Sequence, residues 1–159
     1  MMANKPPTSI EDVDLDVLEG TLSFYIRSIN IAVSRDLDER LDGLDIAKGT
    51  GKISTLLLVD SHPGIRPSIL AQLTLKDRSA MGRIVDQMVA HGLIRRETSA
   101  GDSRVQELYI TPRGAEQAVK VRALVTKQSQ DFFAGIPQEE QTLLLDMLRR
   151  AYRRIAGLT

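Results

Sequence analysis

The pattern of apolar and polar positions predicts a mainly helical chain. Between residues 15 and 41, leucine, isoleucine and valine recur every three or four positions, which is the spacing of one helical face. One long helix is therefore expected over 15–41. Apolar positions at helical spacing predict further helices over 52–61, 65–73, 77–91, 112–133 and from 138 to about 155. Glycine and proline at 62–64 and 135–137 separate several of these segments.

Residues 65–91 predict two helices joined by a short connector at 74–76. Pro67 suits the first turn of the shorter helix, because its missing N–H is not needed there. Asp77 suits the N-cap of the longer helix. One face of that helix is apolar (Met81, Ile84, Val85, Met88, Val89) and the other is small or polar (Ser79, Gly82, Arg83, Asp86). The small residues would let the helix backbone approach a neighbouring molecule.

Two short β-prone runs, 93–98 and 105–110, follow the longer helix and predict a hairpin. The connecting residues 99–104 are polar and carry Gly101, which suits a turn. Arg95, Arg96 and Arg104 are expected on or near this tip. The order helix, turn, helix, hairpin predicts a winged helix-turn-helix, which places one helix in the DNA major groove and a loop beside it. An arginine on such a loop can enter a narrow minor groove.

Residues 102–114, DSRVQELYITPRG, resemble the wing signature of the MarR family of bacterial transcription regulators: Asp-x-Arg, three residues, then Leu-x-hydrophobic-Thr-x-x-Gly. Residues 73–94 are similar to the recognition helix of this family and its exit. The resemblance is specific over about 50–115 and looser over the rest of the chain. It implies a homodimer formed by the terminal helices, and often repression relieved by a small molecule.

The expected organisation has three parts. Residues 1–12 form a mobile tail, 13–48 and 115–159 form a helical dimerisation region, and 49–114 form the DNA-binding lobe. The segment 15–41 is apolar on two faces, and such a helix needs two partners. One partner is its own domain, and the resemblance makes a second subunit the other. The alternative is that one subunit covers both faces.

Composition removes several classes of function. The chain has no cysteine, which excludes disulfides and cysteine-based redox or metal sensing. Its two histidines have no nearby ligand companions, so neither a metal site nor a cofactor is expected. No catalytic constellation appears, and residues 49–52 lack the full spacing of a phosphate loop and predict a flexible turn. Without a membrane-spanning run or signal peptide, the chain is expected in the cytoplasm.

Charge is balanced overall but not along the chain. The 21 basic and 21 acidic residues give a net charge of zero. Residues 1–48 hold 5 Lys and Arg against 10 Asp and Glu, a net of −5, and residues 49–159 hold 16 against 11, a net of +5. DNA binding by such a chain should depend on local basic patches.

The predicted DNA contacts follow the winged helix-turn-helix. Arg83 is the first choice for a base or phosphate, with Arg78 and Ser79 beside it. Ser68 and Lys76 should hold the DNA backbone, Arg104 should enter the minor groove, and Asp102 should orient that arginine by a charge-assisted hydrogen bond. The complete set is Ser68, Lys76, Arg78, Ser79, Gly82, Arg83, Arg95, Arg96, Asp102 and Arg104. A two-fold dimer implies a pseudo-palindromic operator in double-stranded DNA, with half-sites roughly 34 Å apart.

The family resemblance also implies an effector, such as an aromatic or phenolic acid or its thioester. The residues expected to line its site are Tyr25, Arg27, Ile29, Arg35 and His62, with the arginines suited to an anion. A different class of function stays open, a winged helix used for protein contact without DNA. An enzyme is not expected.

Overall fold

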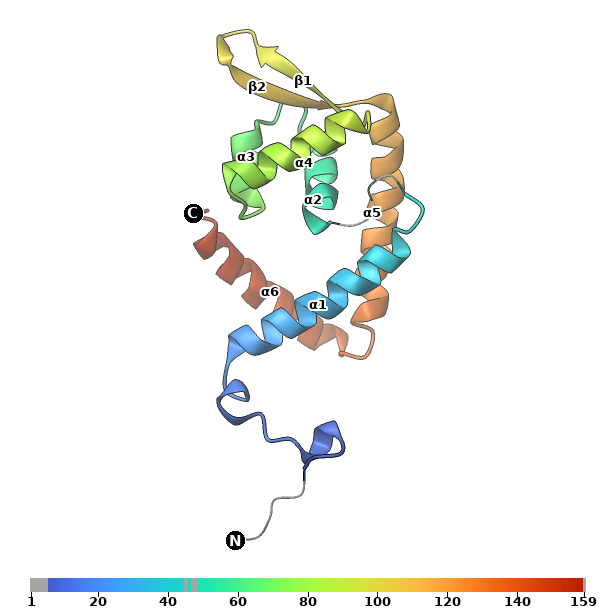
Figure 1. Cartoon of the computed structure of the whole chain (residues 1–159), viewed down its shortest axis with the longest axis vertical. Coiled ribbons are helices and arrows are strands. Elements are labelled where there is room, and N and C mark those ends of the chain that lie inside the picture. Colours follow the sequence, from blue (N-terminus) through green and yellow to red (C-terminus); the bar gives the residue numbers. More distant parts are fainter. Residues whose placement is uncertain (1–5, 45, 47–48, 159) are drawn as a thin grey trace. The chain divides into compact units, whose positions relative to one another are not determined.

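The structure is a computed structural model that describes residues 6–44, 46 and 49–158 (Figure 1). It divides into two compact units, Met1–Arg35 and Asp36–Thr159, and helix α1 (Leu22–Arg40) crosses the boundary. Among the described residues, no helix has the length and apolar character needed to cross a bilayer.

The first unit begins with two short 3-10 helices, η1 (Ile10–Asp12) and η2 (Asp16–Leu18), ahead of α1. The prediction of one helix from residue 15 is wrong at its start. Asp16 has a φ of +52°, and Gly20 precedes α1, where a helical glycine would be unfavourable. The apolar spacing continued across the break because a 3-10 turn also brings positions i and i+3 to one side. Of the expected mobile tail, residues 1–5 lie outside the described part, and 10–12 form η1.

The second unit contains the remaining elements close to their predicted ranges. They are α2 (Thr50–Ser61), α3 (Pro67–Leu73), α4 (Arg78–Ala90), β1 (Ile94–Ser99), β2 (Asp102–Ile110), α5 (Pro112–Phe132) and α6 (Gln138–Ile155). Helix α2 packs against α4, α5 and β2, and α3 packs against α4 and β2 (Figure 1). The centre of the core lies among these elements and includes Leu56, Leu70, Met81, Met88 and Leu108, each at most 1% exposed.

The expected flexible turn at residues 49–52 is wrong. Gly49 is the N-cap of α2, and the helix begins at Thr50. Gly51 is buried in the first helical turn, where a β-carbon would stand 2.8 Å from Cδ1 of Ile84. The glycine therefore serves close packing of α2 against α4.

The hairpin is longer than predicted. Strands β1 and β2 are antiparallel, with Ile94 opposite Ile110 and Arg96 opposite Leu108, and the register shifts between Thr98 and Ser99. Only residues 100–101 connect the strands, so the expected six-residue tip at 99–104 is wrong. The outer half of the hairpin is almost entirely exposed, and a strand exposed on both faces has no apolar alternation to mark it.

Two segments of the chain meet where the hairpin ends and α5 begins, because Thr111 contacts Gly92 and Leu93. The Thr111 N–H donates to the Leu93 carbonyl oxygen (3.1 Å), and its hydroxyl donates to the Gly92 carbonyl oxygen (2.6 Å). The same hydroxyl accepts from the Gly114 N–H (3.0 Å), which caps α5. A β-carbon on buried Gly114 would overlap the Leu93 carbonyl oxygen. Only glycine allows this approach.

Gly114→Ala is expected to lower the free energy of unfolding by about 3 kcal/mol, because the backbone oxygen it meets cannot rotate away. Urea denaturation followed by circular dichroism measures the change. The matched control is Gly82→Ala in α4, where a β-carbon meets nothing within 4 Å. That control should raise the free energy of unfolding by about 1 kcal/mol through helix propensity. Equal midpoints for Gly114→Ala and the parent chain would contradict the close approach.

Candidate functional site

Helix α4 presents one face to the core and the other to solvent. Asp77 caps it as predicted, since its Oδ1 accepts from the Ala80 N–H at 2.7 Å. Met81, Val85 and Met88 are each 1% exposed and anchor the inner face. The outer face carries Arg78, Ser79 and Arg83, all exposed, around Gly82. Because a β-carbon at Gly82 would meet nothing, the glycine leaves open space along this face.

The two residues predicted to hold the DNA backbone have different surroundings. Ser68 is exposed in the first turn of α3, directly after Pro67 at the helix start. Lys76 is half-buried and leans over the start of α2, where a β-carbon on Gly51 would stand 2.5 Å from its Cε. Leu75, in the connector before it, has a φ of +55°.

Arg104 lies in strand β2 rather than in the hairpin turn, and its side chain is exposed. The Asp102 carboxylate accepts a hydrogen bond from the Arg104 backbone N–H at 2.9 Å. The expected charge-assisted bond is therefore made to the backbone, not to the guanidinium. Asp102 fixes the conformation of the chain at Arg104 and leaves the guanidinium available.

Arg95 and Arg96 lie near the base of the hairpin, so the expectation that they lie on or near its tip is wrong. Arg95 pairs with Glu97 and stacks on the Tyr109 ring at 4.8 Å. The Tyr109 hydroxyl donates to the Glu107 carboxylate (2.9 Å), and this bond raises the pKa of Tyr109 above its usual value. Arg96 pairs with Asp86 on α4. Both arginines therefore already have a carboxylate partner within the chain.

Three arginines differ from this pair. Within the described part of the chain, the side chains of Arg78, Arg83 and Arg104 make no ion pair with a carboxylate. All three are exposed, Arg78 and Arg83 on α4 and Arg104 on β2 of the hairpin. Unpaired guanidinium groups carry five donors and suit phosphate oxygens or the acceptor edge of guanine.

The residues expected to line an effector site belong to different units. Tyr25, Arg27, Ile29 and Arg35 lie on α1 within the first unit, where the Tyr25 hydroxyl donates to the Glu19 carbonyl oxygen at 3.2 Å. His62 follows α2 in the second unit, and its Nδ1 lies 2.9 Å from the Ser61 hydroxyl. Each of these assignments stays a prediction.

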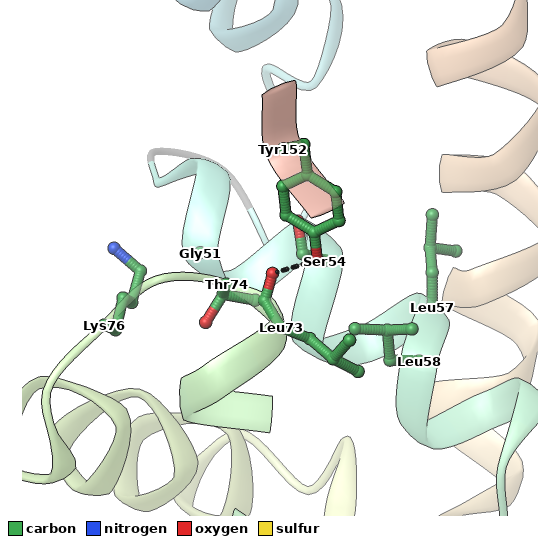
Figure 2. Close-up of a pocket in the computed structure, with 8 residues that line it drawn as sticks. All are labelled: Gly51, Ser54, Leu57, Leu58, Leu73, Thr74, Lys76 and Tyr152. Atoms are coloured by element: carbon green, nitrogen blue, oxygen red, sulfur yellow. Dashed lines mark hydrogen bonds between the residues drawn. The ribbon is translucent and has the colours of Figure 1, made fainter. Parts of the chain in front are cut away.

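The second unit contains a cavity of about 460 Å³ beside the helix-turn-helix (Figure 2). Its wall is apolar at Leu57, Leu58 and Leu73. Ser54, Thr74, Lys76 and Tyr152 add polar groups to the lining, and Gly51 completes it. The Tyr152 hydroxyl of α6 donates to the Leu73 carbonyl oxygen (2.7 Å), which joins α6 to the end of α3. An apolar wall with a few polar groups is typical of small-molecule sites of this size.

Sequence reasoning missed this cavity. Of its lining residues only Lys76 was predicted to have a role, and that role was DNA contact. No motif marks the others, because they come from α2, the end of α3, the connector after it, and α6, and these segments meet only in the folded chain. Among the described residues, no group of three His, Asp or Glu side chains could hold a metal ion.

Comparison with known proteins gives a consistent result. A family model described as MarR family matches residues 48–105. A putative transcriptional regulatory protein for the hcr operon of Thauera aromatica is 31% identical over 137 residues, which is 86% of this chain and 82% of that protein. The chain covers more than two thirds of this relative, so the likeness extends beyond the lobe.

Solved structures agree on the fold. The transcriptional repressor CouR, solved in complex with a 23-mer DNA duplex, has a TM-score of 0.80 at 22% identity, covering 89% of this chain and 99% of that one. CouR from Rhodococcus jostii RHA1 bound to p-coumaroyl-CoA has a TM-score of 0.73 at 20% identity, covering 89% and 95%. These likenesses confirm the predicted winged helix-turn-helix fold.

Asp77→Ala is expected to lower the free energy of unfolding by about 1 kcal/mol, because the first turn of α4 loses its cap. Thermal or urea unfolding checks this value. Asp77→Ser is the matched control, since serine can accept the same hydrogen bond and should stay close to the parent. If the serine variant lost as much as the alanine variant, the side-chain cap would not be the cause.

Proposed function

The chain belongs to the MarR family of transcriptional regulators, and on this premise we propose that it is a homodimeric repressor that binds a pseudo-palindromic operator. The observation that carries the DNA-binding proposal is the outer face of α4. It combines open backbone at Gly82 with the exposed, unpaired guanidinium groups of Arg78 and Arg83. A helix of this kind can lie close to base edges in the major groove.

In this proposal Arg83 contacts a base or phosphate, with Ser79 and Arg78 beside it. Arg104 enters the minor groove, and Asp102 holds its backbone. The exposed hydroxyl of Ser68, near the start of α3, contacts the DNA backbone. Arg95 contributes positive potential from the base of the hairpin, and its ion pair with Glu97 reduces that contribution.

The dimer proposal is supported by α6. None of its residues is buried within the described chain. Its apolar side chains Leu143, Leu145, Met147, Leu148 and Ile155 are between 45% and 70% exposed. So many exposed apolar side chains on one helix favour an interaction site there. The proposed organisation therefore keeps 13–48 and 115–159 as the dimerisation region and 49–114 as the DNA-binding lobe.

The proposal assigns release from DNA to an aromatic or phenolic acid, or its thioester. CouR, which shares this fold, has been crystallised with p-coumaroyl-CoA. The cavity of Figure 2 supplies an apolar wall for a ring and a lysine for an anion. It also touches the connector between α3 and α4, so a ligand there can bias the position of α4. For release, the ligand must bind the DNA-incompetent state more tightly than the competent state.

DNA binding is tested by fluorescence anisotropy with a labelled duplex from upstream of the chain's own gene, over a salt series. Arg83→Ala should weaken binding by about 5- to 150-fold, the range for loss of a specific contact. Arg104→Ala should weaken binding and reduce the salt slope by about 1. Lys120→Ala is the matched control, because this exposed α5 lysine pairs with Glu116 away from α6 and should keep the parent affinity.

If the parent chain bound neither this duplex nor random duplex at low salt, the repressor proposal would fail. That result would favour the alternative function, a winged helix that contacts another protein. Equal binding to all duplexes would mean that this fragment holds no operator, and the same variants would then be tested on operators selected from a random pool.

Effector release is tested with p-coumaric acid, p-coumaroyl-CoA and CoA alone, added to the DNA complex. Lys76→Met should raise the ligand concentration for half-release by about 10- to 100-fold, the effect of losing a charged hydrogen bond. Each variant is compared with its own ligand-free DNA affinity. Lys120→Met is the control, since this α5 lysine is exposed and pairs with Glu116. Release that is equally sensitive in Lys76→Met would contradict this location for the ligand.

A further inference from the structure

The hairpin register decides where the Arg96 side chain lies. Cross-strand partners project to the same face of a two-stranded sheet, and Arg96 is the partner of Leu108. Leu108 is fully buried, and Ile94, two positions before Arg96 on the same face, is 2% exposed. Arg96 therefore lies on the hairpin face that meets the core and α4. Arg95, one position earlier, lies on the opposite face with Tyr109.

On this face Arg96 donates from Nη2 to Oδ1 of Asp86. Asp86 belongs to the outer side of α4, at positions i+7, i+4 and i+3 from Ser79, Gly82 and Arg83. The Asp86 side chain is 66% exposed and that of Arg96 34%. An ion pair so exposed contributes little to the free energy of unfolding.

The remaining connections of the hairpin are at its base and mostly on β2. The Gly64 N–H donates to the Leu108 carbonyl oxygen (2.8 Å), and the Leu108 N–H donates to the Ile65 carbonyl oxygen (3.1 Å). In the described part of the chain, Arg96–Asp86 is the ion pair that joins β1 to α4. Beyond it both strands are largely exposed up to the turn. A small rotation at the base therefore becomes a large displacement at Arg104.

We infer that Asp86 and Arg96 are a positioning pair that sets the angle of the hairpin to α4, and that Arg96 is not a DNA contact. This inference rests on the proposed DNA-binding function. It predicts a change in DNA affinity opposite to the change expected from charge alone. Asp86 is a carboxylate on the face proposed to approach phosphate, so simple electrostatics predicts tighter DNA binding when its charge is removed. A positioning role predicts weaker binding to the operator.

The first test measures operator affinity and salt slope for Asp86→Asn, Arg96→Ala and the exchanged pair Asp86→Arg with Arg96→Asp. Both single variants should bind the operator about 3- to 10-fold more weakly, with the parent salt slope, and the exchanged pair should recover most of the loss. Glu116→Gln is the matched control, since it removes one carboxylate from an exposed ion pair on α5, away from α6. Urea midpoints should be unchanged in every variant.

The second test does not depend on DNA. The chain has no cysteine, so Gln87→Cys on α4 and Ser103→Cys on β2 give two unique spin-label positions. Mixing with excess unlabelled chain leaves one labelled subunit per dimer, and pulsed EPR gives the distance distribution between α4 and the hairpin. Asp86→Asn should broaden or shift that distribution, and the exchanged pair should restore it.

Three outcomes would overturn the inference. They are equal or tighter operator binding by Asp86→Asn, a salt slope lowered by about 1 in Arg96→Ala as for a phosphate contact, and an unchanged distance distribution in Asp86→Asn. A parent chain that binds no DNA would instead end the proposed function. The distance measurement would still show whether the pair orients the hairpin.

Discussion

The contact that Thr111 makes with Gly92 and Leu93 is the one on which the rest of the lobe depends. One threonine closes the base of the hairpin through Gly92 and Leu93 and caps α5 through Gly114. Gly92 itself has a φ of +68° and turns the chain out of α4. The exit of α4, the start of the hairpin and the start of α5 therefore meet at one place. The direction of the hairpin relative to α4 is already limited before any side chain on the outer strands contributes.

A large part of this arrangement could be predicted from the sequence, because it depends on residues that are close together in the chain. Asp77 is a capping residue at the right spacing from the apolar face of α4, and Pro67 marks the start of α3. The buried triad Met81, Val85 and Met88 follows from helical periodicity alone. These features depend on neighbours within one or two turns, which a single sequence contains.

The predictions that are wrong concern features that residues close together in the chain do not determine. The apolar spacing places the start of α1 too early, because 3-10 turns share the apolar spacing of a helix. Residues 99 and 102–104 look like loop in the sequence, because solvent on both faces of the strands removes the apolar alternation. Arg95 and Arg96 look alike in sequence, yet they lie on opposite faces with different partners. The cavity draws residues from segments far apart in the chain, so no spacing indicated it.

The exposure of α6 makes operator occupancy depend on how much of the protein the cell contains. Eighteen residues without one buried side chain gain little from their own chain. In the proposed homodimer their ordering comes from a second copy, so folding and association are one equilibrium. Apparent melting temperature then rises with protein concentration, and the fraction of chains able to occupy two half-sites depends on copy number. At low abundance the regulator would lose operator occupancy without any effector present.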